Sequence, residues 1–276
     1  MSNRYVLITG CSSGIGLAAA KALGAHGFIV ISSARKAEDV ALLRQQGLLA
    51  VRLDLADEAS IEQGAAEALA LAGGRLYGLF NNSGYGQPGA LEDLPTEAFR
   101  EQLETNLFGL HHLIRLVLPS MLEVGEGRII QNSSVLGLVA MKYRGAYNAS
   151  KFALEGYTDT LRLELAGTGV HISLIEPGPI DTRFRANSRV AFLRHIDPAQ
   201  SRHQSAYHQT LTRLEKEGPS GPFTLPAEAC VPPLVHALSS RHPKARYPVT
   251  FPTQLFAWLR RILPTRLLDE LLAKSV

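Results

Sequence analysis

Cysteine is scarce in this chain, and the usual marks of a secreted or membrane-spanning protein are missing. Only two cysteines occur among 276 residues, Cys11 and Cys230, and they lie far apart. This number excludes a disulfide framework and favours free thiols in a reducing compartment. No run of about 18–20 apolar residues is present to span a bilayer, and no charged leader with an apolar region precedes the first strand. A cytoplasmic location is therefore expected.

Charge is also in short supply. Charged residues make up 19% of the chain, and its 28 Lys and Arg against 25 Asp and Glu leave a net charge of +3. Because no basic cluster is interleaved with aromatic residues, nucleic-acid binding is not expected. No grouping of His, Cys, Asp and Glu has metal-ligand spacing, so no metal is predicted, and His111 and His112 are interpreted as helix-surface or packing residues. A hydrophobic content of 46% favours one large globular domain.

What the chain does contain is a regular alternation of short apolar runs with segments of helical spacing. The predicted strands are 5–8, 27–32, 48–53, 75–81, 127–133 and 170–177, and the predicted helices are 14–27, 37–47, 57–73, 95–123 and 146–167. Several of the helices end on glycine, as helix stops commonly do. This order predicts an α/β fold, a doubly wound parallel sheet of the Rossmann type, in a single domain over 1–276.

The alternation breaks in the last third of the chain. Residues 183–222 are polar and too long for an ordinary connection, so they are predicted to form a lid over the substrate. A helix over 227–240 and a strand over 246–250 follow. The segment 253–276 reads as two amphipathic helices separated by Pro264.

A glycine-rich segment, "TGCSSGIG", joins the first strand to the first helix. A turn of this kind directs backbone N–H groups at one point, and the helix N-terminus adds partial positive charge, so a pyrophosphate can be held there. Glycine is needed because a Cβ would block the approach of the phosphate. The alternative is a tight turn at a helix start, but the strand–turn–helix context favours a dinucleotide site at Gly10, Gly14 and Gly16.

The end of the second strand indicates which dinucleotide is used. Sites selective for NAD place an acid about 20 residues past the loop, whereas sites for NADP place an arginine nearby. Here the strand ends in Arg35, and Glu38 and Asp39 come only later, inside the next helix. Arg35 can pair with a 2′-phosphate, and the Ser12 hydroxyl can add a donor. NADP(H) is therefore predicted, the alternative being a solvated arginine at a strand end.

A catalytic group is indicated by "YNASK", which places Tyr147 and Lys151 on one face of a helix. A free tyrosine has a pKa of about 10 and exchanges protons poorly at neutral pH. An ammonium nearby favours the phenolate and is expected to lower that pKa. Ser134 lies at the end of a predicted parallel strand, where ligands bind in this architecture. Singly, each of these residues has a purely structural interpretation.

In order and spacing, these motifs resemble the short-chain dehydrogenase/reductase family over residues 4 to 182. The resemblance rests on "TGCSSGIG", Asp54, "NNSG", Asn106, Ser134, "YNASK" and "PGPIDT". It is strongest to the branch of 17β-hydroxysteroid dehydrogenases, retinol dehydrogenases and bacterial NADP-dependent aldehyde reductases. The family implies that Tyr147 is the general acid or base and that Ser134 binds the substrate oxygen. It implies that Lys151 binds the nicotinamide ribose and lowers the tyrosine pKa, while Asn106 holds a water in a proton relay.

The resemblance also implies the cofactor contacts. Asp54 would bond the adenine amino group with Leu55 beside it, Asn82 would line the adenosine side, and Ile180 and Thr182 would bind the nicotinamide carboxamide. The glycine loop contributes Ser12, Ser13 and Ile15 together with Gly10, Gly14 and Gly16. One departure is Ser83, where the family usually has alanine.

An NADP(H)-dependent reductase of an apolar aldehyde or ketone is therefore expected. The alternatives are an NAD-dependent alcohol or hydroxysteroid dehydrogenase and a non-catalytic NADP(H) sensor, although sensors commonly lack the tyrosine or the lysine. Phe184, Phe192 and Leu193 are expected either to line the substrate pocket or to pack in the core. A homodimer or homotetramer is expected from the family. The segment 253–276 is expected to cover the core or a subunit interface, or to contact a membrane surface.

Overall fold

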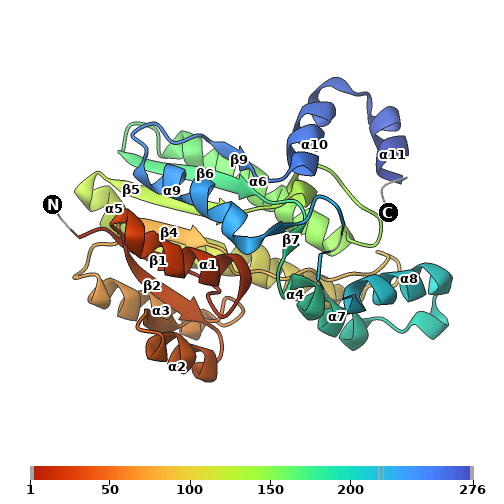
Figure 1. Cartoon of the computed structure of the whole chain (residues 1–276), viewed down its shortest axis with the longest axis horizontal. Helices are drawn as coiled ribbons and strands as arrows, with labels where there is room; N and C mark the ends of the chain where they lie inside the picture. Colours follow the sequence, from red (N-terminus) through yellow and green to blue (C-terminus); the bar gives the residue numbers. More distant parts are fainter. Residues whose placement is uncertain (1–2, 217, 220, 274–276) are drawn as a thin grey trace.

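The computed structural model describes residues 3–216, 218–219 and 221–273 and is built around one parallel sheet of seven strands (Figure 1). The strands lie in the order β3-β2-β1-β4-β5-β6-β9, and every neighbouring pair is parallel. Their bounds are β1 Tyr5–Ile8, β2 Ile29–Ala34, β3 Leu49–Arg52, β4 Gly78–Asn81, β5 Gly127–Asn132, β6 Val170–Glu176 and β9 Arg246–Pro248. The predicted doubly wound α/β fold in one domain is confirmed.

Helices cover both faces of the sheet because successive strand residues point to opposite sides. The helices are α1 Gly14–Ala22, α2 Ala37–Gln45, α3 Glu58–Leu71, α4 Thr96–Leu103, α5 Gly109–Val124, α6 Gly145–Glu164 and α9 Val231–Ser239. Leu7 packs on the side of α3, α5 and α6, whereas Val6 and Ile8 pack on the side of α1, α2 and α9. With both faces covered, ligands have access to the sheet at the carboxyl edge of its strands.

The segment predicted as one helix over 95–123 is interrupted by a π-helical turn at Glu104–Phe108. The extra residue in this turn separates α4 from α5, and it carries the fully buried Asn106. Such turns occur often at functional sites. By length and composition alone, Thr96–Val124 could cross a membrane, but Leu110, Leu113 and Val117 on it are buried in the core of this fold.

The predicted lid is helical where the structure describes it, with residues 217 and 220 outside the described part. It forms α7 Phe184–His195 and α8 Gln204–Glu215. Its ends are tied together by a short parallel pair that the sequence did not predict, β7 Ile180–Asp181 with β8 Leu225–Pro226. Phe192 and Tyr207 are fully buried together under the lid, each contributing roughly 2 kcal/mol through burial. Phe192 is therefore a packing residue, and Leu193 is 51% exposed to solvent; neither lines the pocket around Tyr147.

The tail forms α10 Phe251–Ile262 and α11 Thr265–Ala273, with residues 274–276 of the predicted segment outside the described part. Both helices project from the body of the molecule beside β9 (Figure 1). Their apolar side chains are largely exposed, Trp258 to 61%, and only Thr253 and Leu272 are buried. The tail therefore does not cover the core of this chain.

Candidate functional site

The glycine loop leaves the C-terminal end of β1 and closes tightly against its neighbours. Gly10 and Gly14 have φ values of +72° and +58°, which side chains rarely adopt. A Cβ on Gly16 would lie 2.3 Å from the Gly10 carbonyl oxygen and 2.6 Å from Asn82 Nδ2. Helix α1 begins at Gly14, so its free backbone N–H groups and partial positive charge face the loop. This arrangement can hold a phosphate without a charged side chain.

A cleft of about 850 Å³ extends from this loop along the carboxyl edge of the sheet. It is lined by the predicted cofactor residues Gly10, Ser12, Ser13, Gly14, Ile15, Arg35, Asp54, Leu55, Asn82 and Thr182. Arg35 lies just past the end of β2, next to Lys36, and neither cation makes an ion pair within the described residues. Asp54 accepts a hydrogen bond from the Ala56 backbone at 3.1 Å, which fixes the turn after β3. Gly16 and Ile180 do not line this cleft, although Ile180 lines the adjoining pocket.

Asn82, which follows β4, is hydrogen-bonded to the glycine loop. Its Nδ2 donates to the carbonyl oxygens of Thr9 at 2.9 Å and Gly10 at 3.2 Å. Its Oδ1 accepts a hydrogen bond from Asn132 Nδ2 at 2.9 Å. The side chain therefore connects the ends of three strands, and its predicted contact with the adenosine side stays a prediction.

A second pocket, of about 240 Å³, adjoins the cleft and brings together Ser134, Tyr147 and Lys151. Ser134 follows β5, and the other two lie on the first turns of α6. The Ser134 hydroxyl acts on the Tyr147 phenol to lower its pKa, and the Tyr147 ring packs edge-on against Phe184 at 5.4 Å between centroids. Ser134 Oγ also accepts a hydrogen bond from the Leu136 backbone at 3.1 Å. Phe184 is thus the one residue of the three apolar lid candidates that reaches the pocket.

The electrostatics of this trio correct one expectation. Burial raises the pKa of Tyr147 to about 12, although the Ser134 hydrogen bond and the Arg144 charge oppose this rise. Burial also lowers the pKa of Lys151 to about 8. The lysine donates to the Asn132 carbonyl at 2.7 Å, and its Nζ lies 5.8 Å from the Tyr147 ring centroid. The pKa of Tyr147 is thus raised and not lowered overall, because desolvation of the phenol dominates, and the role of Lys151 in lowering it stays a prediction.

The side-chain amide of Asn106 already makes hydrogen bonds to other groups of the protein. Its Nδ2 donates to the Tyr85 carbonyl at 3.0 Å and to Ser150 Oγ at 3.1 Å, and its Oδ1 accepts from the Tyr85 backbone at 3.2 Å. These bonds hold the chain after β4 against α6. The predicted water in a proton relay stays a prediction.

The pocket also contains residues that the sequence did not single out. Arg144 precedes α6, Ser188 lies on α7, and Arg213 and Leu214 lie on α8. The lid residues come more than 30 positions after Tyr147, and the packing of α7 and α8 over the sheet edge is what brings them to it. Arg144 could have been suspected from its place three residues before Tyr147.

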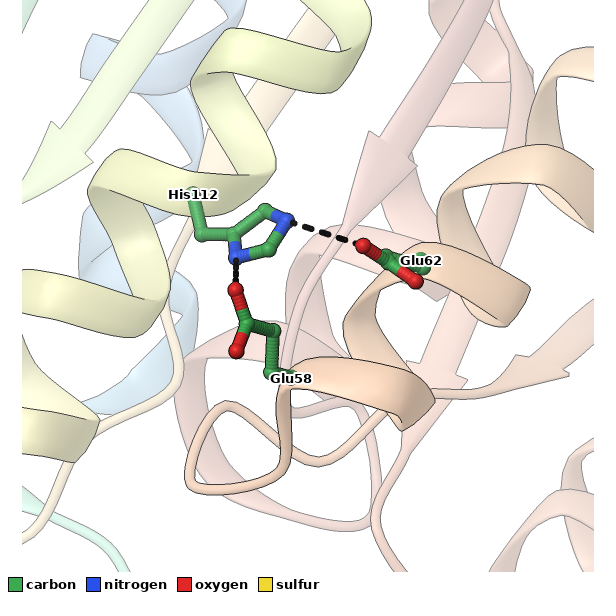
Figure 2. Close-up of side chains that lie close together, drawn as sticks. All are labelled: Glu58, Glu62 and His112. Carbon is green, nitrogen blue, oxygen red and sulfur yellow. Dashed lines mark ion pairs between the residues drawn. The ribbon is translucent and has the colours of Figure 1, made fainter.

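One group of possible metal ligands lies away from both pockets (Figure 2). Glu58 and Glu62 on α3 face His112 on α5, and the sequence did not pair them because only helix packing joins them. The His112 nitrogens point at different carboxylates, Nδ1 at Glu58 Oε1 (3.4 Å) and Nε2 at Glu62 Oε1 (3.9 Å). This places an imidazole between two carboxylates, and one possible ligand atom from each of the three residues lies within 4.8 Å of the others.

Known proteins resemble this chain over nearly its whole length. The family model for short chain dehydrogenase matches residues 4–191. YbbO, an uncharacterized oxidoreductase of Escherichia coli strain K12, is 43% identical over 269 residues, covering 98% of this chain and 94% of YbbO. An NADPH-dependent 3-dehydrocapnine reductase of Ornithobacterium rhinotracheale is 31% identical, covering 99% of this chain and 97% of the relative. The structure of a Burkholderia phymatum short chain dehydrogenase/reductase with NAD has a TM-score of 0.77 at 29% identity, covering 95% and 92% of the two chains.

Proposed function

The chain belongs to the short-chain dehydrogenase family of oxidoreductases, and we propose that it reduces an apolar aldehyde or ketone to the alcohol with NADPH. Members of this family bind a nicotinamide cofactor and act on CH–OH or carbonyl groups. The observation that carries the proposal is the pocket that brings the Tyr147 phenol together with Ser134 and Lys151. The phenol is protonated at neutral pH, so it has a proton to donate in the direction of reduction.

The residues fit a dinucleotide. A Cβ at Gly16 would fill the space of the loop backbone, and the positive φ of Gly10 and Gly14 lets the loop N–H groups converge. At the other end of the cleft, Arg35 and Lys36 supply two cations without an ion-pair partner in the described chain, which supports a 2′-phosphate there. Asp39 also lines the cleft. Because an acid can bond the ribose 2′-hydroxyl of NAD, NAD is the alternative cofactor.

Ser134, Tyr147 and Lys151 have separate roles in the proposed reduction. When bound, the cofactor supplies a hydride to the carbonyl carbon. Ser134 Oγ holds the carbonyl oxygen beside the Tyr147 hydroxyl, which donates its proton to that oxygen as charge develops there. Lys151, cationic below its pKa of about 8, stabilises the phenolate that remains. Because the pocket is lined by buried groups, this charge interaction is weakly screened.

The proposed substrate has an apolar body, which the lining of the pocket supports. Leu136, Met141, Phe184 and Leu214 line the pocket near the tyrosine. The Ornithobacterium relative is named as a reductase of 3-dehydrocapnine that uses NADPH. A NAD-dependent alcohol or hydroxysteroid dehydrogenase remains the second enzyme hypothesis, supported by the NAD complex of the Burkholderia neighbour. A cofactor sensor is disfavoured, because Tyr147, Ser134 and Lys151 all meet in one pocket.

The test is steady-state kinetics with both cofactors against a panel of aldehydes and ketones. We expect turnover with NADPH, and Arg35→Gln should raise the KM for NADPH about 10- to 100-fold while leaving that for NADH unchanged. Arg75→Gln, an exposed arginine outside the cleft, is the matched control. A lower KM for NADH in the wild type would assign the protein to NAD, and the absence of any turnover would favour the sensor.

Two further proposals concern the setting of the enzyme. We propose a cytoplasmic enzyme, which is supported by the two free, buried cysteines. We also propose a homodimer or homotetramer through α5 and α6, where Phe108 and Leu163 stay exposed, Leu163 to 74%. Sedimentation velocity of the purified chain tests the assembly.

A further inference from the structure

The pocket around Tyr147 has an unbalanced charge. Four cationic side chains line it, Lys151, Arg144, Arg185 and Arg213, and its lining includes no Asp or Glu. Other arginines of the lid face carboxylates on the surface, as Arg189 does with Glu215. A pocket with cations alone repels further cations and attracts an anion.

Arg144 is the cation that most needs a partner. In the part of the chain that the structure describes, its guanidinium has no hydrogen bond and no ion pair. Burial and the nearby charge of Arg213 lower the pKa of Arg144 to about 10. The Arg144 side chain is half-buried and lines the pocket, so its guanidinium is free to pair with an anion that enters there. Arg185 differs, because it lies 3.8 Å from the Asp181 carboxylate and donates to the Lys216 carbonyl at 2.9 Å and to the Gly218 carbonyl.

The backbone holds Arg144 in place. Tyr143, the residue before it, has a φ of 60°, the one positive φ at a non-glycine residue in the described chain. Its carbonyl accepts from the Gly89 N–H at 3.0 Å, and its ring packs edge-on against His203 and Tyr207. Strain of this kind persists only where the surroundings over-determine the conformation, and it is frequent at functional sites.

An independent observation on the lid points to the same ligand. Ser188 on α7 is fully buried and lines the pocket, and its hydroxyl has no hydrogen-bond partner among the described residues. A buried hydroxyl normally has a partner, so an acceptor from a ligand would complete this site. Neither Arg144, Arg213 nor Ser188 lines the larger cleft in which the cofactor phosphates are expected.

We propose that Arg144, together with Arg213 and Ser188, binds an anionic group of the substrate itself. The preferred substrate is then a carbonyl compound whose apolar body carries a carboxylate, sulfonate or phosphate. This inference rests on the proposed function and narrows its substrate class. Arginine suits the role because its planar fork pairs with such oxygens through two hydrogen bonds.

The experiment compares para-formylbenzoate with its methyl ester, two aldehydes that differ in one charge, using NADPH and the full chain. Wild-type enzyme should show a kcat/KM at least about 10-fold higher for the acid, mainly through KM. Arg144→Gln should abolish this preference while turnover of the ester continues. Arg189→Gln, which changes a lid arginine outside the pocket, should keep the preference.

Equal or better turnover of the ester by the wild type would overturn the inference and leave NADPH-dependent carbonyl reduction intact. Should neither aldehyde turn over, calorimetric titration of the NADP⁺-loaded enzyme with benzoate decides. Saturable binding that Arg144→Gln weakens at least about 10-fold would support the inference, and no binding would overturn it. Competition of benzoate with NADPH would also overturn it, because the anion site would then belong to the cofactor.

Discussion

Replacing Tyr147 by phenylalanine separates the chemistry of the site from its architecture. The substitution removes one hydroxyl and keeps the ring, which is buried against Phe184 at 5.4 Å between centroids. The neighbouring Ser134 is neutral, and a neutral hydrogen bond to it would be worth about 1 kcal/mol. Ser134 Oγ still accepts from the Leu136 backbone, so no polar atom loses its last partner. We therefore expect the free energy of unfolding to change by about 1 kcal/mol or less.

The effect on turnover should be far larger. A positioned general acid contributes about 10²- to 10⁴-fold to rate, and no other group in the pocket can replace Tyr147. Lys151 donates to the Asn132 carbonyl, and an alcohol such as that of Ser134 is a far weaker acid than a phenol. The kcat for reduction should fall by at least about 100-fold. NADPH affinity should change less than about twofold, because the glycine loop and Arg35 are untouched.

The assay combines three measurements: NADPH oxidation with the best aldehyde, fluorescence titration of NADPH, and denaturant unfolding. Tyr157→Phe is the matched control, since it removes one phenolic hydroxyl from the same helix, bonded to His111 at 3.1 Å outside the pocket. It should keep near wild-type turnover. If Tyr147→Phe retained more than a tenth of wild-type kcat, the phenol would not be the proton donor. If it lost NADPH affinity about tenfold, the hydroxyl would be acting through the cofactor site.

Four other perturbations test the surrounding structure. Gly16→Ala should abolish dinucleotide binding in a fluorescence titration, because its Cβ would lie 2.3 Å from the Gly10 carbonyl oxygen; retained binding would show that the loop can open. Burial lowers the pKa of Lys151 from 10.5 to about 8, a penalty of about 3 kcal/mol. Between pH 8 and 10.5 Lys151 is protonated in the unfolded chain but not in the folded one, so the free energy of unfolding rises with pH in this range. Lys151→Met should therefore stabilise the protein at pH 7 but not above pH 10.5. In denaturant titrations, no gain at pH 7 would contradict the buried ammonium. Zn²⁺ or EDTA should leave the melting temperature unchanged, because the His112 nitrogens face different carboxylates; a rise with Zn²⁺ would establish a metal site. The exposed tail should sediment the chain with anionic vesicles, and Trp258→Glu should prevent this; a chain that stays in solution would leave the tail to subunit contact.

Much of the fold was predictable from the sequence because local and global preferences agree along most of the chain. Each sheet strand is a short apolar run, and each run is followed by a segment of helical spacing, which only a parallel sheet accommodates. The glycine loop was predictable for the same reason, since its residues are adjacent in sequence. Tyr147 and Lys151 were predictable because one helix carries both.

The parts that escaped prediction depend on contacts between distant segments. The π turn at Glu104–Phe108 inserts one residue without any change in composition. Arg144 and Arg213 meet only when the lid folds over the sheet edge, and Glu58 meets His112 only when α3 packs on α5. The sign of the Tyr147 pKa shift also escaped, because it depends on how completely the phenol is buried.

Two residues that escaped prediction break common rules of protein structure: Arg144 has no acceptor within the described chain, and Tyr143 has a positive φ. The predicted Lys151 breaks another, because it is a buried cation. The stability of the sheet core offsets these costs, since native proteins break local rules mainly where function requires it. If an anion lies among the cations, as proposed, it relieves their mutual repulsion and stabilises the closed lid. Substrate binding and lid order are then thermodynamically coupled, and an anionic ligand should protect α7 and α8 from hydrogen exchange more than its neutral ester does.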